Sequence, residues 1–192
     1  IIDKPTIPPN NKIINHFNEY NGMLYISTGF GISVYSLESL EFGDSYYIGD
    51  LGSQINITQT TVFGDLIYAS TSNNGIRSAL VADDNIIDYQ QWTTVIGGGY
   101  KGIQSLESEI YTVNNSNTIL KWDPDLGFSP IDSFISPVVG FGVTSGVLTI
   151  TTESSIHAFS EGYSLISELI SLFEYDYLLQ TGYAFNNSFY LG

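Results

Sequence analysis

One anchoring residue recurs through this sequence at a regular interval. Aromatic or β-branched residues, each on a short apolar segment that follows a turn, stand at Tyr25, Tyr68, Tyr111, Thr149 and Tyr190. The spacings between them are 43, 43, 38 and 41 residues by subtraction. A period of roughly 40–45 residues that holds only strand-like patterns is typical of a propeller blade. The repeat therefore predicts an all-β chain with the architecture of a β-propeller.

The first repeat shows how a blade is written in the sequence. Segments 13–17, 23–27 and 32–37 are expected to form three strands, and Asn21-Gly22 supplies a hairpin turn between the first two. The third segment alternates on the two-residue period of a strand. A fourth strand is expected to end in Tyr46-Tyr47-Ile48-Gly49. Each repeat thus predicts a four-stranded antiparallel sheet.

The whole chain, residues 1–192, is expected to be a single propeller segment. Its repeats are predicted at about 14–53, 54–102, 103–137 and 138–177, with a partial fifth at 178–192. Propellers close with about four to eight blades. We therefore expect about four blades that are part of a larger, seven-bladed ring and of a longer parent protein, and an open arc of this kind favours self-association. A small four-bladed ring is the alternative.

One segment has two interpretations. Apolar residues between 164 and 178 recur at helical spacing, which locally favours an amphipathic helix. The repeat instead requires a fourth strand, a loop and the next first strand there. We follow the repeat, with a short helical insertion as the alternative.

Charge and composition exclude several functions. Five basic residues against 20 acidic ones give a net charge of −15. Nucleic acids and anionic membranes need a basic footprint, so neither is an expected partner. The absence of cysteine excludes disulfides, thiolate catalysis and Cys-ligated metal. No apolar run approaches the length of a membrane span, so membrane insertion is not expected.

Catalytic, metal and cofactor motifs receive little support, so the sequence predicts a non-enzymatic protein without a cofactor. His16 and His157 are far apart and lie on predicted strands, where a structural or surface role is favoured. A Ser-His-Asp arrangement stays open, because its members converge only in space. The glycine-rich segment 97–102 lacks a Gly-Lys-Ser/Thr ending and is interpreted as an inter-blade turn. Segment 123–127 is interpreted as a hairpin turn, since it lacks the remaining ligands of a calcium loop.

A binding surface, if the chain has one, is expected on the loops between second and third strands, which gather on one face of a propeller. Asn and aromatic residues there suit hydrogen bonding and stacking, although turns favour Asn for backbone reasons alone. The candidate binding residues are Phe30, Asn73, Asn74, Asn115 and Asn117, with Tyr100 and Lys101 on a neighbouring inter-blade loop.

The amino-acid sequence of the repeats resembles a known family. Segment 28–35, Thr-Gly-Phe-Gly-Ile-Ser-Val-Tyr, is similar to the core of two-component-regulator propeller repeats. With Tyr46-Tyr47-Ile48-Gly49, segments 67–71 and 74–76, and Asp88-Tyr89-Gln90-Gln91-Trp92, it resembles the N-terminal propeller of the PorZ family, a surface component of the type IX secretion system. The similarity is strongest over residues 14–92. Arg77, where an aromatic residue is expected, and Thr149, where the anchor is elsewhere Tyr, depart from the pattern.

The resemblance implies an exported, non-enzymatic scaffold in the periplasm or at the outer surface of a bacterium of the Bacteroidota. Its implied partners are other secretion proteins, such as a sortase-like peptidase that attaches cargo to lipopolysaccharide. The acidic charge argues that any lipopolysaccharide is bound through other domains. A ligand-sensing periplasmic ectodomain of a hybrid two-component regulator is the alternative function.

Overall fold

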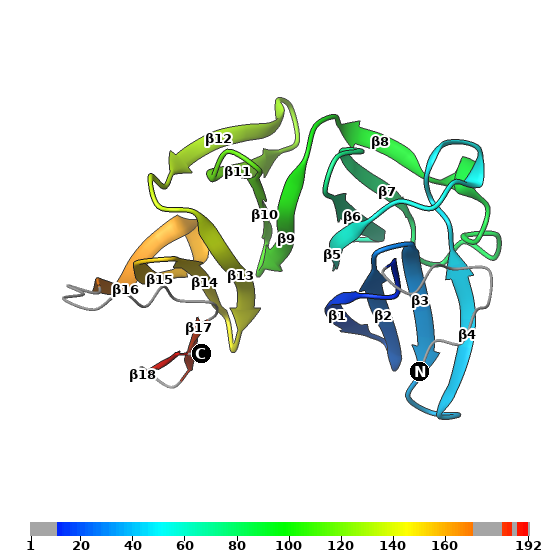
Figure 1. Cartoon of the computed structure of the whole chain (residues 1–192), viewed down its shortest axis with the longest axis horizontal. Coiled ribbons are helices and arrows are strands. Elements are labelled where there is room, and N and C mark those ends of the chain that lie inside the picture. Colours follow the sequence, from blue (N-terminus) through cyan, green and yellow to red (C-terminus); the bar gives the residue numbers. More distant parts are fainter. Residues whose placement is uncertain (1–10, 171–181, 186–187, 192) are drawn as a thin grey trace. The chain divides into compact units, whose positions relative to one another are not determined.

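The computed structural model describes residues 11–170, 182–185 and 188–191 (Figure 1). Its strands form four four-stranded sheets and one two-stranded sheet, and within each sheet strands that follow one another in sequence are neighbours. We call the four-stranded sheets blades 1 to 4. The prediction of an all-β chain with four four-stranded antiparallel blades is confirmed.

Blades 1 and 2 lie in the first half of the chain. Blade 1 consists of β1 (Ile14–Tyr20), β2 (Met23–Thr28), β3 (Gly31–Ser36) and β4 (Glu41–Tyr46). Blade 2 consists of β5 (Ile57–Phe63), β6 (Leu66–Thr71), β7 (Ile76–Leu80) and β8 (Thr93–Ile96). Short 3-10 turns, η2 (Asp50–Gly52) and η3 (Tyr89–Gln91), lie in the connections.

Blades 3 and 4 follow. Blade 3 consists of β9 (Tyr100–Leu106), β10 (Glu109–Asn114), β11 (Thr118–Asp123) and β12 (Gly127–Ser133). Blade 4 consists of β13 (Val138–Thr144), β14 (Val147–Thr152), β15 (Ser155–Ser160) and β16 (Ser164–Ile170), with η4 (Glu161–Tyr163) before its last strand. A hairpin of β17 (Gly182–Phe185) and β18 (Ser188–Leu191) comes after them.

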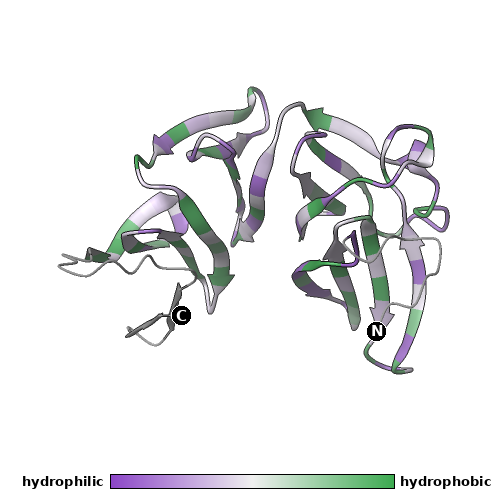
Figure 2. Cartoon of the chain, viewed as in Figure 1, coloured by the Kyte–Doolittle hydropathy of each residue, from purple (hydrophilic) through white to green (hydrophobic). Residues whose placement is uncertain are grey.

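The chain divides into two compact units, residues 1–102 and 103–192. Alternating hydrophobic and hydrophilic residues run along many of the strands, as Figure 2 shows by colour. Successive side chains of a strand point to opposite faces, so this alternation gives each blade faces of different polarity. The apolar faces form one hydrophobic core in each unit.

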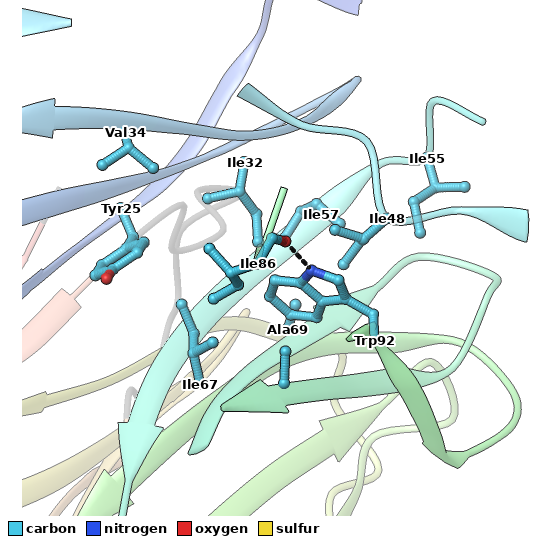
Figure 3. Close-up of a cluster of buried hydrophobic side chains, with 11 residues drawn as sticks. Tyr25, Ile32, Val34, Ile48, Ile55, Ile57, Ile67, Ala69, Ile86 and Trp92 are labelled. Carbon is cyan, nitrogen blue, oxygen red and sulfur yellow. Dashed lines mark hydrogen bonds between the residues drawn. The ribbon is translucent and has the colours of Figure 1, made fainter. Parts of the chain in front are cut away.

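The core of the first unit is formed by blades 1 and 2 (Figure 3). Ile32 and Ile48 from the blade 1 repeat and Ile57 and Ile67 from blade 2 are fully buried in it. Trp92 closes the cluster, and its Nε1 donates a hydrogen bond of 2.8 Å to the carbonyl oxygen of Ile86. A buried indole N–H therefore has the partner that its burial requires.

The core of the second unit lies between blades 3 and 4. Blade 3 contributes Tyr111, Val113 and Ile119, and blade 4 contributes Leu148 and Ile150. All five side chains are fully buried. Full burial of such a side chain contributes roughly 1.5–3 kcal/mol. In each unit, two blades are thus stabilised by the hydrophobic core that forms between their apolar faces.

The anchors that revealed the repeat occupy equivalent positions. Tyr25, Tyr68, Tyr111 and Thr149 lie on the second strands β2, β6, β10 and β14, and all are at most 6% exposed. Tyr190 lies on β18, the second strand of the last hairpin. The period therefore comes from one packing position that each repeat fills again.

The structure differs from two local expectations. β4 ends at Tyr46, so Tyr47, Ile48 and Gly49 belong to the connection into blade 2 and not to the strand as expected. Tyr100 and Lys101 begin strand β9, whereas the sequence placed them on a loop. The loop therefore covers only 97–99.

The ambiguous segment is a strand over its described part, as the repeat predicted. β16 pairs with β15 in antiparallel register, with Glu168 opposite His157. Its Leu165, Ile166 and Leu169 are 56%, 52% and 37% exposed. Helical spacing there does not mark a buried helix face, because pairing with β15 overrides the local pattern. Residues 171–178 lie outside the described part.

Candidate binding surface

The turns between second and third strands are shaped by one polar side chain at the end of the second strand. Thr28 Oγ1 donates to the carbonyl oxygen of Gly31 at 2.8 Å. Thr71 Oγ1 donates to that of Gly75 at 2.7 Å and accepts from the backbone N–H of Asn74 at 2.7 Å. Side chains of this type satisfy turn backbone groups that have no strand partner.

Blades 3 and 4 use the same device. Asn114 Oδ1 accepts from the N–H groups of Ser116 and Thr118 at 2.9 and 3.0 Å. Thr152 Oγ1 accepts from the N–H of Ser155 at 2.9 Å. Each of the four capping residues, Thr28, Thr71, Asn114 and Thr152, stands three positions after the repeat anchor. The repeat therefore encodes the turn together with the buried strand.

These turns are tied to the connections between blades. The N–H of Ser72 donates to the carbonyl oxygen of Asn56 at 3.2 Å, and that of Glu153 donates to Pro137 at 3.0 Å. In blade 2 the N–H of Gly75 also donates to Gly98 at 2.7 Å. Within each blade, second-to-third turns and inter-blade connections consequently lie at the same end. We call this end of a blade its connector end, and the opposite end its hairpin end.

The candidate residues of the first unit divide by exposure. Asn73 and Asn74 are exposed on the blade 2 turn. Phe30 is fully buried, and its ring centroid lies 6.2 Å from that of Tyr47. Tyr100 is 4% exposed and donates its hydroxyl to the carbonyl oxygen of Gly97 at 3.1 Å, and Lys101 is half-buried. The connector end of blade 2 thus displays the two Asn side chains. The rings of Phe30, in the blade 1 turn, and of Tyr100, at the start of β9, are buried.

In the second unit Asn115 and Asn117 share the blade 3 turn. Asn115 is exposed. Asn117 is half-buried with φ of 63°, a left-handed conformation that Asn tolerates better than most residues. Its Oδ1 accepts from the N–H of Val138 at 3.0 Å. Asn117 therefore fixes the connection from blade 3 to blade 4.

A Ser-His-Glu arrangement in blade 4 has the outline of a catalytic triad. Ser155 Oγ lies 2.6 Å from His157 Nε2, and His157 Nδ1 lies 3.1 Å from Glu168 Oε1. Burial lowers the pKa of His157, although Glu168 and Asp132 act in the opposite direction. The imidazole is therefore neutral at neutral pH. Donation from Nδ1 to Glu168 leaves Nε2 to accept from the Ser155 hydroxyl.

The surroundings of these residues favour a structural role. Ser155 is only 8% exposed, and its Oγ is also 2.8 Å from Thr152 Oγ1. Its backbone N–H donates to Thr152, so that N–H does not serve as an oxyanion donor. The His157 ring packs 4.8 Å from Phe134. The sequence left such an arrangement open, and the structure shows a hydrogen-bonded chain that joins β15 to β16.

A partly buried carboxylate joins blades 3 and 4. Glu109 accepts hydrogen bonds from Lys121 and Tyr111, and from the N–H of Gly162 at 2.7 Å. Burial alone would raise the pKa of Glu109, but these donors lower it below its ordinary value. Burial, and then Glu109, raise the pKa of Tyr111. The carboxylate thus stays ionised while the phenol stays protonated at neutral pH.

A cavity of about 590 Å³ lies at the hairpin ends of blades 1 and 2. Tyr20, Met23 and Tyr25 line it from blade 1, and Asp65, Leu80 and Asp83 line it from blade 2, with Asn21, Val81 and Ala82 completing the wall. No local sequence motif predicts this site, because its residues come from strands and turns of two different repeats.

Within the described residues, no three His, Cys, Asp or Glu side chains are grouped so that they could hold a metal ion. Asp123 Oδ1 accepts from the N–H groups of Asp125 and Leu126 at 2.8 and 3.0 Å, so segment 123–127 is the expected hairpin turn. No helix in the described part is long and apolar enough to cross a membrane.

A protein-family comparison matches part of the chain. Residues 4–93 match the family described as TSS9, PorZ, N-terminal beta-propeller domain. No curated protein is similar to the chain in sequence. The sequence resemblance to the PorZ N-terminal propeller is thus confirmed by a match that spans blade 1 and reaches the start of β8.

Solved structures show the same fold. PorZ, an essential surface component of the type IX secretion system of Porphyromonas gingivalis, is similar with a TM-score of 0.72 and 16% identity, over 93% of this chain and 23% of that one. The extracellular domain of a hybrid two-component system from B. thetaiotaomicron gives 0.63 and 15%, over 96% and 26%. The computationally designed protein Ika8 gives 0.63 and 10%, over 92% and 54%. The chain therefore spans between about a quarter and a half of each of these three structures.

Proposed function

From residues 4–93, which match the family of PorZ N-terminal propeller domains, we propose that the chain is a non-enzymatic interaction scaffold of a type IX protein secretion system. The family match is the observation that carries this proposal. The likeness to the P. gingivalis PorZ structure supports it through the fold. The protein would act at the outer surface of a bacterium of the Bacteroidota and serve protein transport.

The geometry is compatible with binding and gives no support to catalysis. The turns at the connector ends are held by their capping side chains, so exposed residues on them are presented on a fixed backbone. Such pre-ordering lowers the entropy lost when a partner binds. We assign partner contact to Asn73, Asn74 and Asn115, the candidate residues that are exposed.

The proposed partner is another protein of the secretion complex, such as a sortase-like peptidase. Direct capture of lipopolysaccharide by this segment is disfavoured by its net charge of −15, since like charges repel before contact. If the complex handles lipopolysaccharide, other domains of the parent protein or other subunits are the proposed binding sites.

The test has two stages in cells that make the parent protein. Deletion of its gene is expected to stop delivery of secreted cargo to the cell surface. The parent carrying Asn73→Lys and Asn74→Lys is then expected to recover less of the peptidase on affinity purification. Thr93→Lys, also an exposed position in blade 2, is the matched control. Normal cargo delivery after deletion would overturn the secretion role, whereas normal recovery by the Asn variant would overturn only the assigned surface.

The sensor function remains a second candidate, because the two-component ectodomain from B. thetaiotaomicron shares the fold over 96% of this chain. For a sensor, deletion of the gene is expected to alter transcription in response to a ligand while cargo delivery stays intact. Measuring cargo delivery and transcripts in the same deletion strain therefore separates the two functions.

A further inference from the structure

We propose that the cavity between the hairpin ends of blades 1 and 2 binds a basic side chain, best an arginine, from a partner protein. The cavity lies at the opposite end of the blades from Asn73 and Asn74. The ligand proposed for it does not depend on the secretion role, because it follows from the lining of the cavity alone.

The cavity has the size and the fixed walls of a binding site. Its volume of about 590 Å³ falls within the usual range for ligand pockets, roughly 300–1,000 Å³. On the blade 1 side, the N–H of Gly22 donates to Glu19 Oε1 at 2.9 Å and its carbonyl oxygen accepts from Leu37 at 2.8 Å. On the blade 2 side, the N–H of Val81 donates to the carbonyl oxygen of Asp65 at 3.0 Å. Both turns that form the rim are therefore held by backbone hydrogen bonds.

The apolar part of the wall suits an aliphatic stem. Met23 is half-buried, and Leu80 is 55% exposed. An arginine stem laid along these side chains would cover the exposed leucine while its charged end stays near the polar rim. The site thus offers both surfaces that an amphipathic side chain needs.

The charges at the rim are negative and uncompensated within the lining. Asp65 is exposed, and its carboxylate has no hydrogen-bond or ion-pair partner among the described residues. Asp83 uses Oδ1 to accept from the N–H of Asn85 at 2.7 Å, which keeps its side chain oriented. No Lys, Arg or His lines the cavity in the described part of the chain. A guanidinium would supply the missing donors to these carboxylates.

The tyrosines complete the recognition of a cation. Burial, followed by the neighbouring Tyr20, raises the pKa of Tyr25, so its phenol stays protonated at neutral pH. Tyr25 is a buried wall residue, whereas Tyr20 is half-buried, and an aromatic side chain of that kind attracts a guanidinium. Arginine suits such a site better than lysine, because its planar group can stack and form two hydrogen bonds together. The net charge of −15 further favours the approach of a basic partner.

The experiment titrates the full chain with three blocked peptides and follows its ¹H–¹⁵N spectrum. The probes are acetyl-Gly-Arg-Gly-amide, its lysine analogue and its citrulline analogue, which keeps the shape of arginine without the charge. We expect the arginine peptide to shift the amides of Leu80, Val81 and Asp83 with a Kd in the millimolar range. We expect the lysine peptide to bind more weakly, and the citrulline peptide to leave these amides unchanged.

Variants separate this site from general electrostatic attraction. Asp65→Asn is expected to weaken arginine binding about tenfold, the effect of losing one charged hydrogen bond. Asp84→Asn, an exposed neighbour that does not line the cavity, is the matched control and should bind as the wild type does. Unchanged spectra outside the cavity would show that both variants remain folded.

Three results would overturn the proposal. They are the absence of shifts up to about 10 mM arginine peptide, equal binding of the arginine and citrulline peptides, and equal weakening by Asp65→Asn and Asp84→Asn. A titration with maltose completes the set. Shifts at the same amides with the sugar alone would identify a carbohydrate site instead.

Discussion

Arg77 Nη2 lies 2.6 Å from Asp50 Oδ1, and this contact joins the third strand of blade 2 to the connection that arrives from blade 1. The two partners differ sharply in environment, since the Arg77 side chain is 8% exposed and the Asp50 side chain 86%. Arg77 Nη1 also donates to the carbonyl oxygen of Ile48 at 2.9 Å. The residue that departs from the family pattern thus links the two blades of the first unit.

Replacing Arg77 should cost much more than replacing Asp50. Arg77→Met keeps an unbranched stem but leaves the Ile48 carbonyl oxygen without this donor, so we expect a loss of about 1–3 kcal/mol in the free energy of unfolding. Asp50→Asn keeps an acceptor for Arg77 Nη2 and removes the charge of a side chain that is 86% exposed, so it should cost less than about 1 kcal/mol. Urea unfolding of the three chains provides the measurement. Equal losses in the two variants would show that the surface ion pair, and not the buried hydrogen bond, matters.

The glycine immediately before the third strand of blade 2 should not tolerate a side chain. Gly75 has φ of 81°, and a Cβ built there would overlap with the carbonyl oxygen of Ile96 on the neighbouring strand. We expect Gly75→Ala to destabilise the chain by at least about 2 kcal/mol.

Gly97→Ala is the control for that substitution, because its Cβ would meet no atom within 4 Å. Thermal unfolding followed by circular dichroism should show a lowered Tm for Gly75→Ala alone. A Tm for Gly75→Ala within error of the wild type would contradict this prediction. It would mean that the backbone near Ile96 moves to accept the new Cβ without loss of stability.

The stability of the chain should depend on pH through His16. Burial lowers the pKa of His16 to about 4, below its ordinary value of 6.5. The unfolded chain therefore takes up this proton first as the pH falls, so the stability present above pH 6.5 is progressively lost toward pH 4. Between pH 7 and pH 5 the loss from this residue should be roughly 2 kcal/mol.

His16→Gln isolates that contribution. Unfolding free energies of both chains, measured by urea at pH 7 and pH 5, should differ in their pH dependence by that amount, with the variant less sensitive. His157 remains in both chains, so its own titration cancels in the comparison. A parallel pH dependence of the two chains would place the titration of His16 near its ordinary range in the folded state.

The hydrogen-bonded side chains of Ser155, His157 and Glu168 should stabilise blade 4 and not act as a nucleophilic site. Ser155→Ala removes the donor to His157 Nε2 and should cost about 1 kcal/mol on urea unfolding. Ser154→Ala, at an exposed neighbouring position, should be nearly neutral. A fluorophosphonate probe should leave Ser155 unmodified because its Oγ is buried among polar partners. Labelling of Ser155 by the probe would contradict the structural interpretation.

Much of the fold could be predicted because each repeat places a buried residue at the same position of its second strand. The buried anchors Tyr25, Tyr68 and Tyr111 set the period, and alternating strands fill the positions between them. Thr28 and Thr71 end the second strands of their blades, and the hydrogen bonds that they make to the turns were not predicted. The order within a blade follows from adjacent strands joined by short turns.

The sites could be predicted far less well, because they depend on residues that meet only in space. Asp65 and Tyr20 line one cavity from different repeats, and no spacing in the sequence indicates it. His157 faces Glu168 only because β15 and β16 pair in that register. Phe30 was expected at the surface from its place in a turn, but its ring is an apolar surface that the protein buries.

In the four capped turns, the backbone conformation at the connector end of each blade is held by the capping side chain and not by the exposed residues of the turn. Since Thr28, Thr71, Asn114 and Thr152 hold the backbone, exposed turn positions such as Asn73 and Asn74 can change without loss of a core contact. Phe30, Gly75 and Asn117 in the same turns keep structural roles. Loops of this kind can exchange their sequences, one blade at a time, without a new core. The chain is therefore a natural frame for grafting, in which new recognition segments could be inserted at Asn73 or Asn115 while the blades beneath stay as they are.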